Sequence, residues 1–128
     1  SFYVNTSHGE GQCLPLMEFM GAGIPALAPR STALEDYIRP TNAFVIASAA
    51  QRSSWQHDSR HAIRNVNYRP DWNAIINAYQ ESYKIAKNDP GAYFKKSLDA
   101  ANTIKEHCSP DKAQKRLSLF LKERLADH

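Results

Sequence analysis

The 128-residue chain has few of the features that mark secreted, membrane-spanning or nucleic-acid-binding proteins. Its two cysteines, Cys13 and Cys108, match neither a disulfide framework nor a metal or redox motif in their spacing. No apolar run approaches the roughly 20 residues of a membrane-spanning helix, and no signal peptide is present. The net charge of +3 is too small to indicate nucleic-acid binding. We therefore expect a cytoplasmic protein with no nucleic-acid partner and no bound metal.

The charge is distributed unevenly along the chain. Residues 1–50 carry two basic and four acidic side chains, whereas residues 51–128 carry 14 basic and nine acidic side chains. A basic carboxy-terminal part either aids solubility or contacts an acidic lipid surface, and we favour solubility. Hydrophobic residues make up 42% of the chain and charged residues 23%, a globular composition that argues against disorder.

The first 50 residues alternate between strand and helix signals. Strands are predicted over Phe2–Thr6, Pro25–Ala28 and Phe44–Ile46, because these segments are short, apolar or rich in β-forming residues. Helices are predicted over Leu14–Met20, which begins at Pro15, and over Ala33–Ile38, which Ser31 or Thr32 can cap with Glu35 in a capping box. This order predicts a parallel sheet, so residues 1–50 are expected to form a partial α/β domain.

Residues 51–128 are predicted to form a loop and the carboxy-terminal helices of the same domain. No clear period is visible over 51–70, and we interpret Trp55, His57, Asp58 and His61 as residues that shape a loop. Three helices are expected to end near Lys87, His107 and Ala126, each opened by an Asp or Ser next to its first turn. The core-facing side of the first of these is predicted from an apolar stripe at helical spacing: Trp72, Ile75, Ile76, Tyr79 and Tyr83.

The last predicted helix is amphipathic. It combines apolar residues with a basic set, namely Leu117, Phe120, Leu121 and Leu125 with Lys112, Lys115, Arg116, Lys122 and Arg124. Such a helix can dock against the rest of the protein or lie on an acidic membrane. We favour docking and keep peripheral membrane contact as the alternative.

The segment that indicates chemistry runs from Ser7 to Glu18. A strand leads into a loop with Gly9 and Gly11, and the loop leads into a helix amino terminus, where free backbone N–H groups can bind an anion. Such loops lie at the carboxyl ends of strands, where ligands bind in open α/β sheets. His8 either donates to a phosphate or shapes the loop, and we favour the structural role.

Two carboxylates flank these backbone donors. Glu10 lies in the loop, and Glu18 follows in a helix whose neighbouring residues are apolar. We expect Glu18 to be largely buried near the first turn, so that it must be hydrogen-bonded or paired. Its partner is either a structural cap or the hydroxyl groups of a ligand. A nucleotide sugar has a matching pattern, with hydroxyl groups at both ends and phosphates between them.

The segment Glu10–Glu18 resembles the Glu-x7-Glu motif of retaining glycosyltransferases with the GT-B fold, the family 4 group. The usual wording is Glu-Gly-Phe-Gly-Leu-Pro-x-x-Glu-Ala-Met-Ala-x-Gly-x-Pro-Val. The chain matches it at eight positions: Glu10, Gly11, Leu14, Pro15, Glu18, Met20, Gly23 and Pro25. Glu35 matches the acidic residue that usually follows the next strand. The resemblance covers residues 2–46 and implies a partial Rossmann-like carboxy-terminal domain of the GT-B fold.

The resemblance assigns a role to each matched position. Glu10 would contact the hydroxyl groups of the transferred sugar and act as the catalytic residue. The backbone of Gly11, Gln12, Cys13 and Leu14 would approach the sugar and the diphosphate, and Glu18 would accept hydrogen bonds from the ribose. The family transfers a sugar with retention and typically needs no metal, so we expect no cofactor. Its acceptors, in polysaccharide or lipopolysaccharide synthesis, include glycans and lipid-linked glycans.

Two departures from the family pattern stand out. Gln12 and Cys13 replace the usual Phe-Gly, and we expect the Cys13 side chain to pack inward as a small hydrophobe. The family's basic pair for the diphosphate and its acceptor site lie upstream, in parts that include the amino-terminal domain. Neither falls within these 128 residues, which we expect to be part of a longer enzyme and inactive alone. A GT-B-like epimerase or phosphorylase, or a non-catalytic nucleotide-sugar-binding module, remains open as an alternative.

Overall fold

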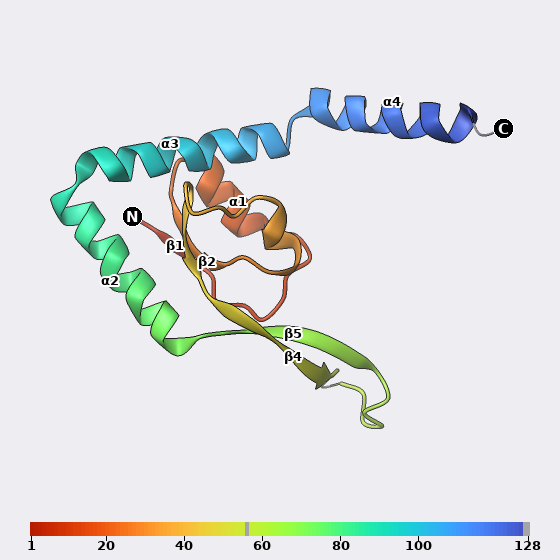
Figure 1. The fold of residues 1–128 in the computed structure, drawn as a ribbon, viewed down its shortest axis with the longest axis horizontal. Helices are drawn as coiled ribbons and strands as arrows, with labels where there is room; N and C mark the ends of the chain where they lie inside the picture. The colour runs from red at the N-terminus through yellow and green to blue at the C-terminus, as the bar shows by residue number, and fades with distance from the viewer. Residues whose placement is uncertain (56, 127–128) are drawn as a thin grey trace.

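The computed structural model describes residues 1–55 and 57–126 and has a mixed α/β fold (Figure 1). A parallel sheet has the order β1-β2-β3, with strands β1 (Tyr3–Val4), β2 (Ala26–Pro29) and β3 (Ala43–Ile46). A second, antiparallel sheet is the hairpin of β4 (Ser48–Ser54) and β5 (Arg64–Pro70). The helices are α1 (Leu14–Gly21), the 3-10 turn η1 (Thr32–Asp36), α2 (Trp72–Asn88), α3 (Pro90–His107) and α4 (Pro110–Ala126).

The parallel sheet is covered on both faces. Side chains alternate along β2, so that Ala26 and Ala28 join one core cluster while Leu27 joins another. The first cluster packs the sheet against α1 and α3, with Leu16, Met20 and Ile104 as members. The second packs it against α2 through Ala78. The result is a three-layer arrangement that buries the sheet, as expected for parallel strands.

Helix α1 ends in a Schellman motif at Gly23. The N–H of Gly23 donates to the Met20 carbonyl at 2.9 Å, and the N–H of Ile24 donates to the Phe19 carbonyl at 2.9 Å. Gly23 has φ of 79°, a left-handed conformation that favours glycine. A Cβ there would also lie 3.0 Å from the Ser97 hydroxyl on α3. The predicted end of this helix at the Gly21–Gly23 segment is therefore confirmed.

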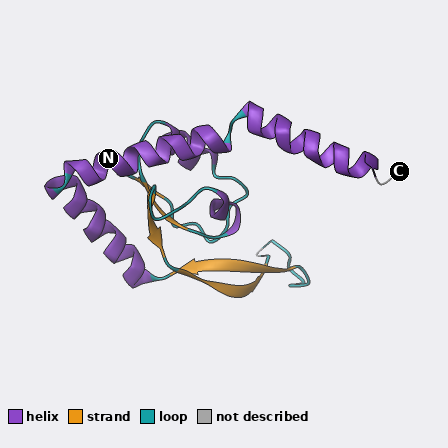
Figure 2. Ribbon diagram, turned by 45° about the horizontal axis from the view of Figure 1, so that its top comes forward, coloured by secondary structure: helices purple, strands orange, loops and turns teal. Residues whose placement is uncertain are grey.

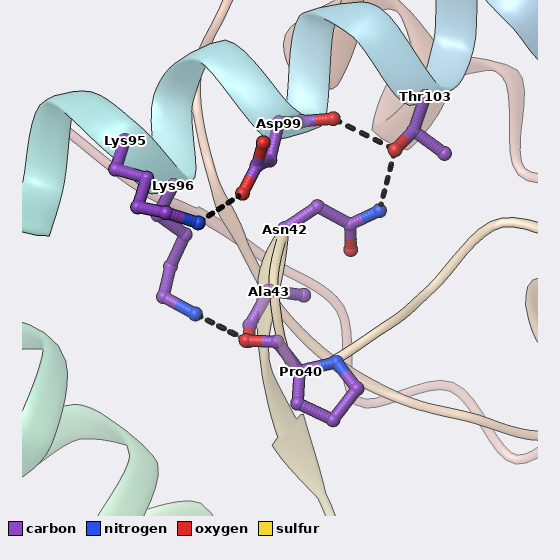
Figure 3. A network of polar contacts seen from close by, with 7 residues as sticks. All are labelled: Pro40, Asn42, Ala43, Lys95, Lys96, Asp99 and Thr103. Atoms are coloured by element: carbon purple, nitrogen blue, oxygen red, sulfur yellow. Dashed lines mark hydrogen bonds and ion pairs between the residues drawn. The ribbon is translucent and has the colours of Figure 1, made fainter.

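Polar contacts fasten α3 to the start of β3 (Figure 3). The fully buried Asn42 donates through Nδ2 to the Tyr37 carbonyl at 2.8 Å and to the Thr103 hydroxyl at 3.0 Å. Its Oδ1 accepts from the Arg39 N–H at 2.9 Å. Nearby, Lys96 Nζ donates to the Ala43 carbonyl at 3.1 Å and lies 4.7 Å from the centre of the Phe44 ring. Partial burial lowers the pKa of Lys96.

The elements expected in residues 1–50 are present, with two differences. The first strand is limited to Tyr3–Val4, because the Asn5 side chain turns the chain by accepting from the Ser7 N–H at 2.7 Å. The helix predicted over 33–38 is instead the 3-10 turn η1. Its capping residue is Ser31, whose side chain makes no cap hydrogen bond, so the predicted capping box with Thr32 and Glu35 is absent.

The loop predicted over residues 51–70 is wrong, because most of this segment forms the β4–β5 hairpin. Figure 2 shows this hairpin extending away from the parallel sheet. Opposite pairs such as Gln51 with Asn67 and Ser53 with Asn65 are polar, so the hairpin lacks the alternation that identifies a half-buried strand. Gln56, part of the predicted loop, lies outside the described residues.

The four residues that we interpreted as shaping a loop lie at the tip of the hairpin: Trp55, His57, Asp58 and His61. Trp55 and His57 meet edge to face with ring centroids 5.6 Å apart, and His61 Nδ1 lies 3.1 Å from the Ser54 hydroxyl. Asp58 accepts from the N–H groups of Ala62 at 2.8 Å and Ile63 at 2.9 Å. These hydrogen bonds lower the pKa of Asp58.

The predicted core face of α2 is wrong at Trp72, Ile76, Tyr79 and Tyr83, whereas Ile75 packs against the second core cluster as expected. Trp72 is 72% exposed, Tyr83 is 64% exposed and Tyr79 is 50% exposed. The side that packs on the sheet is narrower and made of smaller residues: Ala74, Ile75, Ala78, Ser82 and Ile85. The aromatic residues at helical spacing therefore form a solvent-facing side, which the period alone did not distinguish from the buried side.

Helix α4 has the predicted bounds but does not pack on the body of the chain. Figures 1 and 2 show it extending away from the other elements. Every side chain from Pro110 to Leu125 is exposed, and Lys112 Nζ pairs with Glu106 at 3.0 Å near its start. The docking that we favoured does not occur against the described residues. Within them, no helix combines the length and apolar character needed to cross a membrane.

Replacing Asn42 by alanine is expected to lower the free energy of unfolding by about 2–4 kcal/mol. The change removes the partner of the partly buried Arg39 N–H and of the buried Tyr37 carbonyl, and it opens a small cavity. Urea unfolding measures the loss, and Asn102→Ala, at an exposed position of the neighbouring helix α3, is the matched control. A loss below that of the control would contradict the proposed fastening of α3.

Acidification is expected to loosen the hairpin tip before the sheet. Since the pKa of Asp58 is lowered in the fold, its contribution is present above the unfolded pKa and is lost as the pH falls through the folded pKa. Hydrogen exchange at Ala62 and Ile63, corrected for intrinsic rates, should therefore accelerate as the pH falls. In Asp58→Ala the exchange should already be fast at neutral pH. Equal protection of the two amides in both proteins would refute this.

Candidate functional site

The Asn5 side chain organises the loop that joins β1 to α1. It is 8% exposed, and its Nδ2 donates to Glu10 Oε1 at 3.2 Å and to Cys13 Sγ at 3.0 Å. Its Oδ1 accepts from the Ser7 N–H. One side chain thus holds the start of the loop, the first carboxylate and the residue before the helix. Residues Asn5, Thr6 and Ser7 also fit the Asn-x-Ser/Thr glycosylation sequon, but the Asn5 side chain is buried in the folded loop.

Glu10 is held from a second side by η1. Its N–H donates to the Thr32 hydroxyl at 2.9 Å, and its carbonyl accepts from the Ala33 N–H at 3.4 Å. Glu10 is partly exposed, and only Oε1 of its carboxylate contacts Asn5, so Oε2 is not used in this contact. The sequence prediction missed Asn5 and Thr32. An asparagine at the end of a strand, two residues before Ser7, is a signal for the turn that places it.

Cys13 has the left-handed backbone conformation in this loop. It is the N-cap of α1, with φ of 57° and ψ of 63°. Gly9 and Gly11 do not supply this conformation, because neither has a positive φ. Cys13 occupies the position at which the Glu-x7-Glu motif usually has glycine, the residue that adopts this conformation without cost. Its side chain packs against the first core cluster, which confirms the inward orientation that we expected.

The Cys13 thiol is suited to packing and not to reaction. Burial raises the pKa of Cys13, and the charge of Glu10 raises it further. The group therefore stays a neutral thiol near pH 7, whereas nucleophilic cysteines have a lowered pKa. Beneath it, Tyr37 donates from its hydroxyl to the Gln12 carbonyl at 2.7 Å. Burial also raises the pKa of Tyr37, which keeps this donor protonated.

The start of α1 presents unused backbone donors. The N–H groups of Gly11, Gln12, Cys13 and Leu14 make no hydrogen bond to the described residues. Gly11, Gln12 and Leu14 are exposed, and Cys13 is partly exposed. Pro15 has no N–H group, and the N–H of Met17 donates to the Cys13 carbonyl at 3.2 Å. Two of these donors lie in the loop and two at the amino terminus of α1, a type of junction that can bind an anion such as a phosphate.

Glu18 differs from the prediction in its environment. It is exposed and lies beyond the first turn of α1, whereas burial near the first turn was expected. The buried face of this short helix is formed by Leu16, Met17 and Met20. Leu14 and Phe19 are 58% and 43% exposed, which explains why an apolar sequence did not imply burial on most sides. A solvated Glu18 needs no structural partner and is available to a ligand.

Three further polar residues make structural contacts or lack a partner among the described residues: His8, Arg39 and Ser7. The His8 carbonyl accepts from the Tyr68 N–H of β5 at 2.7 Å, so His8 joins the loop to the hairpin. Arg39 donates to the carbonyls of Glu35, Asp36 and Ile38. The Ser7 hydroxyl is shielded from solvent and has no partner among the described residues. These residues contain no cluster of three or more His, Cys, Asp or Glu side chains that could hold a metal.

Comparisons with protein-family models, with curated proteins and with solved structures found no match to the chain.

Glycine at position 13 is expected to give a more stable protein than alanine, by about 1 kcal/mol. Both variants lose the thiol, but alanine keeps the cost of a positive φ and glycine does not. Thermal or urea unfolding of the pair measures the difference. The matched pair is Cys108→Gly and Cys108→Ala, at a residue with φ of −91°, where glycine should give no such advantage. Equal stabilities at position 13 would contradict the left-handed conformation.

Proposed function

We propose that this chain is the donor-binding part of a retaining glycosyltransferase that uses a nucleotide sugar. The observation that carries the proposal is the junction of β1 and α1. There the Glu-x7-Glu motif combines four unused backbone donors with a left-handed residue at the position where the family has glycine. A carboxylate lies at each end of this set. Such an arrangement suits a ligand with a charged diphosphate between two groups of hydroxyls.

The mixed α/β architecture is compatible with a partial Rossmann-like GT-B domain. The three parallel strands follow one another in the sheet, and α1 crosses from β1 to the adjacent strand β2. The site loop begins at the carboxyl end of β1, where ligands of open α/β sheets bind. We take the finer GT-B assignment as part of the proposal, since it depends on the motif and not on the strand order alone.

In the proposed reaction each group has a defined task. The bond between the anomeric carbon and the diphosphate oxygen breaks, and a bond to an acceptor hydroxyl oxygen forms on the same face of the sugar. The hydroxyl proton leaves with the nucleoside diphosphate. Glu10, oriented by Asn5, would accept hydrogen bonds from the transferred sugar. The N–H groups of residues 11–14 would stabilise charge on the diphosphate, and Glu18 would bind the ribose.

Nucleoside diphosphates should bind to this loop even without catalysis. We expect titration with UDP, GDP, ADP and dTDP to shift amide resonances of residues 10–18 in NMR spectra, with the strongest response identifying the base. Glu18→Ala should weaken this binding about tenfold, because hydrogen bonds to a charged group contribute roughly 1.5–3 kcal/mol and an exposed carboxylate such as Glu18 is expected at the lower end of that range. Glu123→Ala, which removes an exposed carboxylate on the distant helix α4, is the matched control and should bind normally.

The controls also separate the alternatives. An unchanged affinity in Glu18→Ala, or shifts that avoid the loop, would exclude the proposed donor site. Incubation of an enzyme containing this chain with labelled donor distinguishes a transferase from an epimerase, which forms a new donor sugar and no glycoside. A binding module would retain the shifts and release no labelled product.

A further inference from the structure

Helix α4 has an apolar side that no described part of the chain covers. Large apolar residues at spacings of three and four lie together on this side of the helix: Leu117, Phe120, Leu121 and Leu125. Their side chains are between 47% and 73% exposed. A contiguous exposed apolar surface commonly marks a binding site, so we ask which surface this side of the helix would contact.

The helix can meet an external surface along almost its whole length. Figures 1 and 2 show it extending away from the sheet and from the other helices. Polar contacts to the end of α3 occur at its start, where Lys112 Nζ pairs with Glu106 at 3.0 Å. From Ala113 to Leu125, no side chain makes a hydrogen bond or ion pair with the described residues. The apolar side can therefore bind a surface without breaking a polar contact of the fold.

The charge of α4 indicates the chemistry of that surface. The helix carries two acidic side chains and five basic ones, which are spread from its first turn to its last: Lys112, Lys115, Arg116, Lys122 and Arg124. All five basic side chains are exposed. Arg124 lies beside the apolar side, with its guanidinium carbon 5.5 Å from the centre of the Phe120 ring. Basic side chains combined with one apolar side are typical of helices that lie in the interface of an anionic membrane.

A second copy of the helix matches this charge poorly. It would bring five more basic side chains towards the first five, with only two carboxylates on each helix to offset them. Like charges on facing helices repel each other, whereas an anionic lipid surface attracts the whole basic set. A lipid surface is also extended, as is a set of charges that runs along the full helix.

We propose that α4 binds the surface of a membrane that contains anionic lipids. The apolar side enters the boundary between headgroups and acyl chains, and the long basic side chains keep their charged groups near the lipid phosphates. This inference goes beyond the proposed donor binding and does not depend on it, because α4 lies outside the β1–α1 junction. It places the chain at a lipid surface.

Co-sedimentation of the full chain with vesicles tests the proposal. The probes are vesicles of phosphatidylcholine alone and vesicles of phosphatidylcholine and phosphatidylglycerol in equal parts. We expect binding to the anionic vesicles to be about tenfold stronger and to decrease as salt is added, because salt screens the attraction. No binding to the anionic vesicles, or equal binding to both kinds, would overturn the proposal.

Two leucines of α4 provide a matched pair of variants. Leu117→Glu and Leu119→Glu make the same change of residue and charge at exposed positions, but Leu119 lies on the opposite side of the helix. Leu117→Glu should weaken binding to the anionic vesicles about tenfold more than Leu119→Glu does. Equal losses in the two variants would overturn the assignment to the apolar side.

A second pair of variants tests the role of charge. Lys115→Gln should weaken binding about fivefold, because each basic residue near an anionic surface adds to the attraction. Lys84→Gln removes the same charge from an exposed position of α2 and should leave the binding unchanged. Equal effects of the two substitutions would contradict the assignment of the basic set to the lipid surface.

Two further measurements separate the remaining readings. In sedimentation equilibrium without lipid, a dimer that Leu117→Glu dissociates and Leu119→Glu does not would assign the apolar side to a second copy and overturn the lipid proposal. UDP added to Leu117→Glu should still shift residues 10–18. Normal UDP binding without vesicle binding by the unsubstituted chain would overturn the role of α4 alone, whereas vesicle binding without UDP binding would overturn the donor site alone.

Discussion

The contacts of one buried amide determine the geometry of the site. Asn5 connects the end of β1 to Glu10 and to Cys13, two residues that no regular secondary structure would bring together. Helix α1 is only eight residues long, too short to be stable in isolation. Its position is therefore set by packing against the sheet and α3 and by this junction. Because Asn5 meets these needs from inside the fold, the backbone N–H groups of residues 11–14 stay unpaired within the described residues.

The loop shows how structural and functional demands are divided within a few residues. Cys13 places its side chain in the core and takes a left-handed backbone, so that its backbone shapes the outer surface while its thiol stabilises the interior. Thr32, which has φ of 51°, lies in η1 after β2, and its hydroxyl accepts a hydrogen bond from the Glu10 N–H. Neither Gly9 nor Gly11 supplies the unusual dihedral angle. Glycine content alone therefore did not identify where the chain turns.

Sequence analysis predicted the parts of the fold that local chemistry determines. Asp71 caps α2 by accepting from the Ala74 N–H, as expected for an aspartate before a helical pattern, and all three late helices have nearly the predicted bounds. The sequence predictions were wrong where contacts between distant segments determine the structure. The polar β4–β5 hairpin had no buried face to produce a period of two, and Trp72, Tyr79 and Tyr83 had helical spacing but face solvent. Glu10 and Glu18 were predicted from their motif, whereas the roles of Asn5 and Thr32 depend on side-chain contacts that the motif does not contain.

The hairpin adds nothing to either core cluster, and this has an evolutionary consequence. Mutations at Gln51, Arg69 and their neighbours change a surface without disturbing the packing that keeps α1, α3 and the sheet together. Proteins tolerate few destabilising changes before they fall below the stability that function requires. Substitutions in a hairpin outside the core are therefore expected to cost less stability than substitutions at the buried Asn5 and Asn42. Within a lineage, the surface of the hairpin could change by drift while the strand–loop–helix junction stays unchanged.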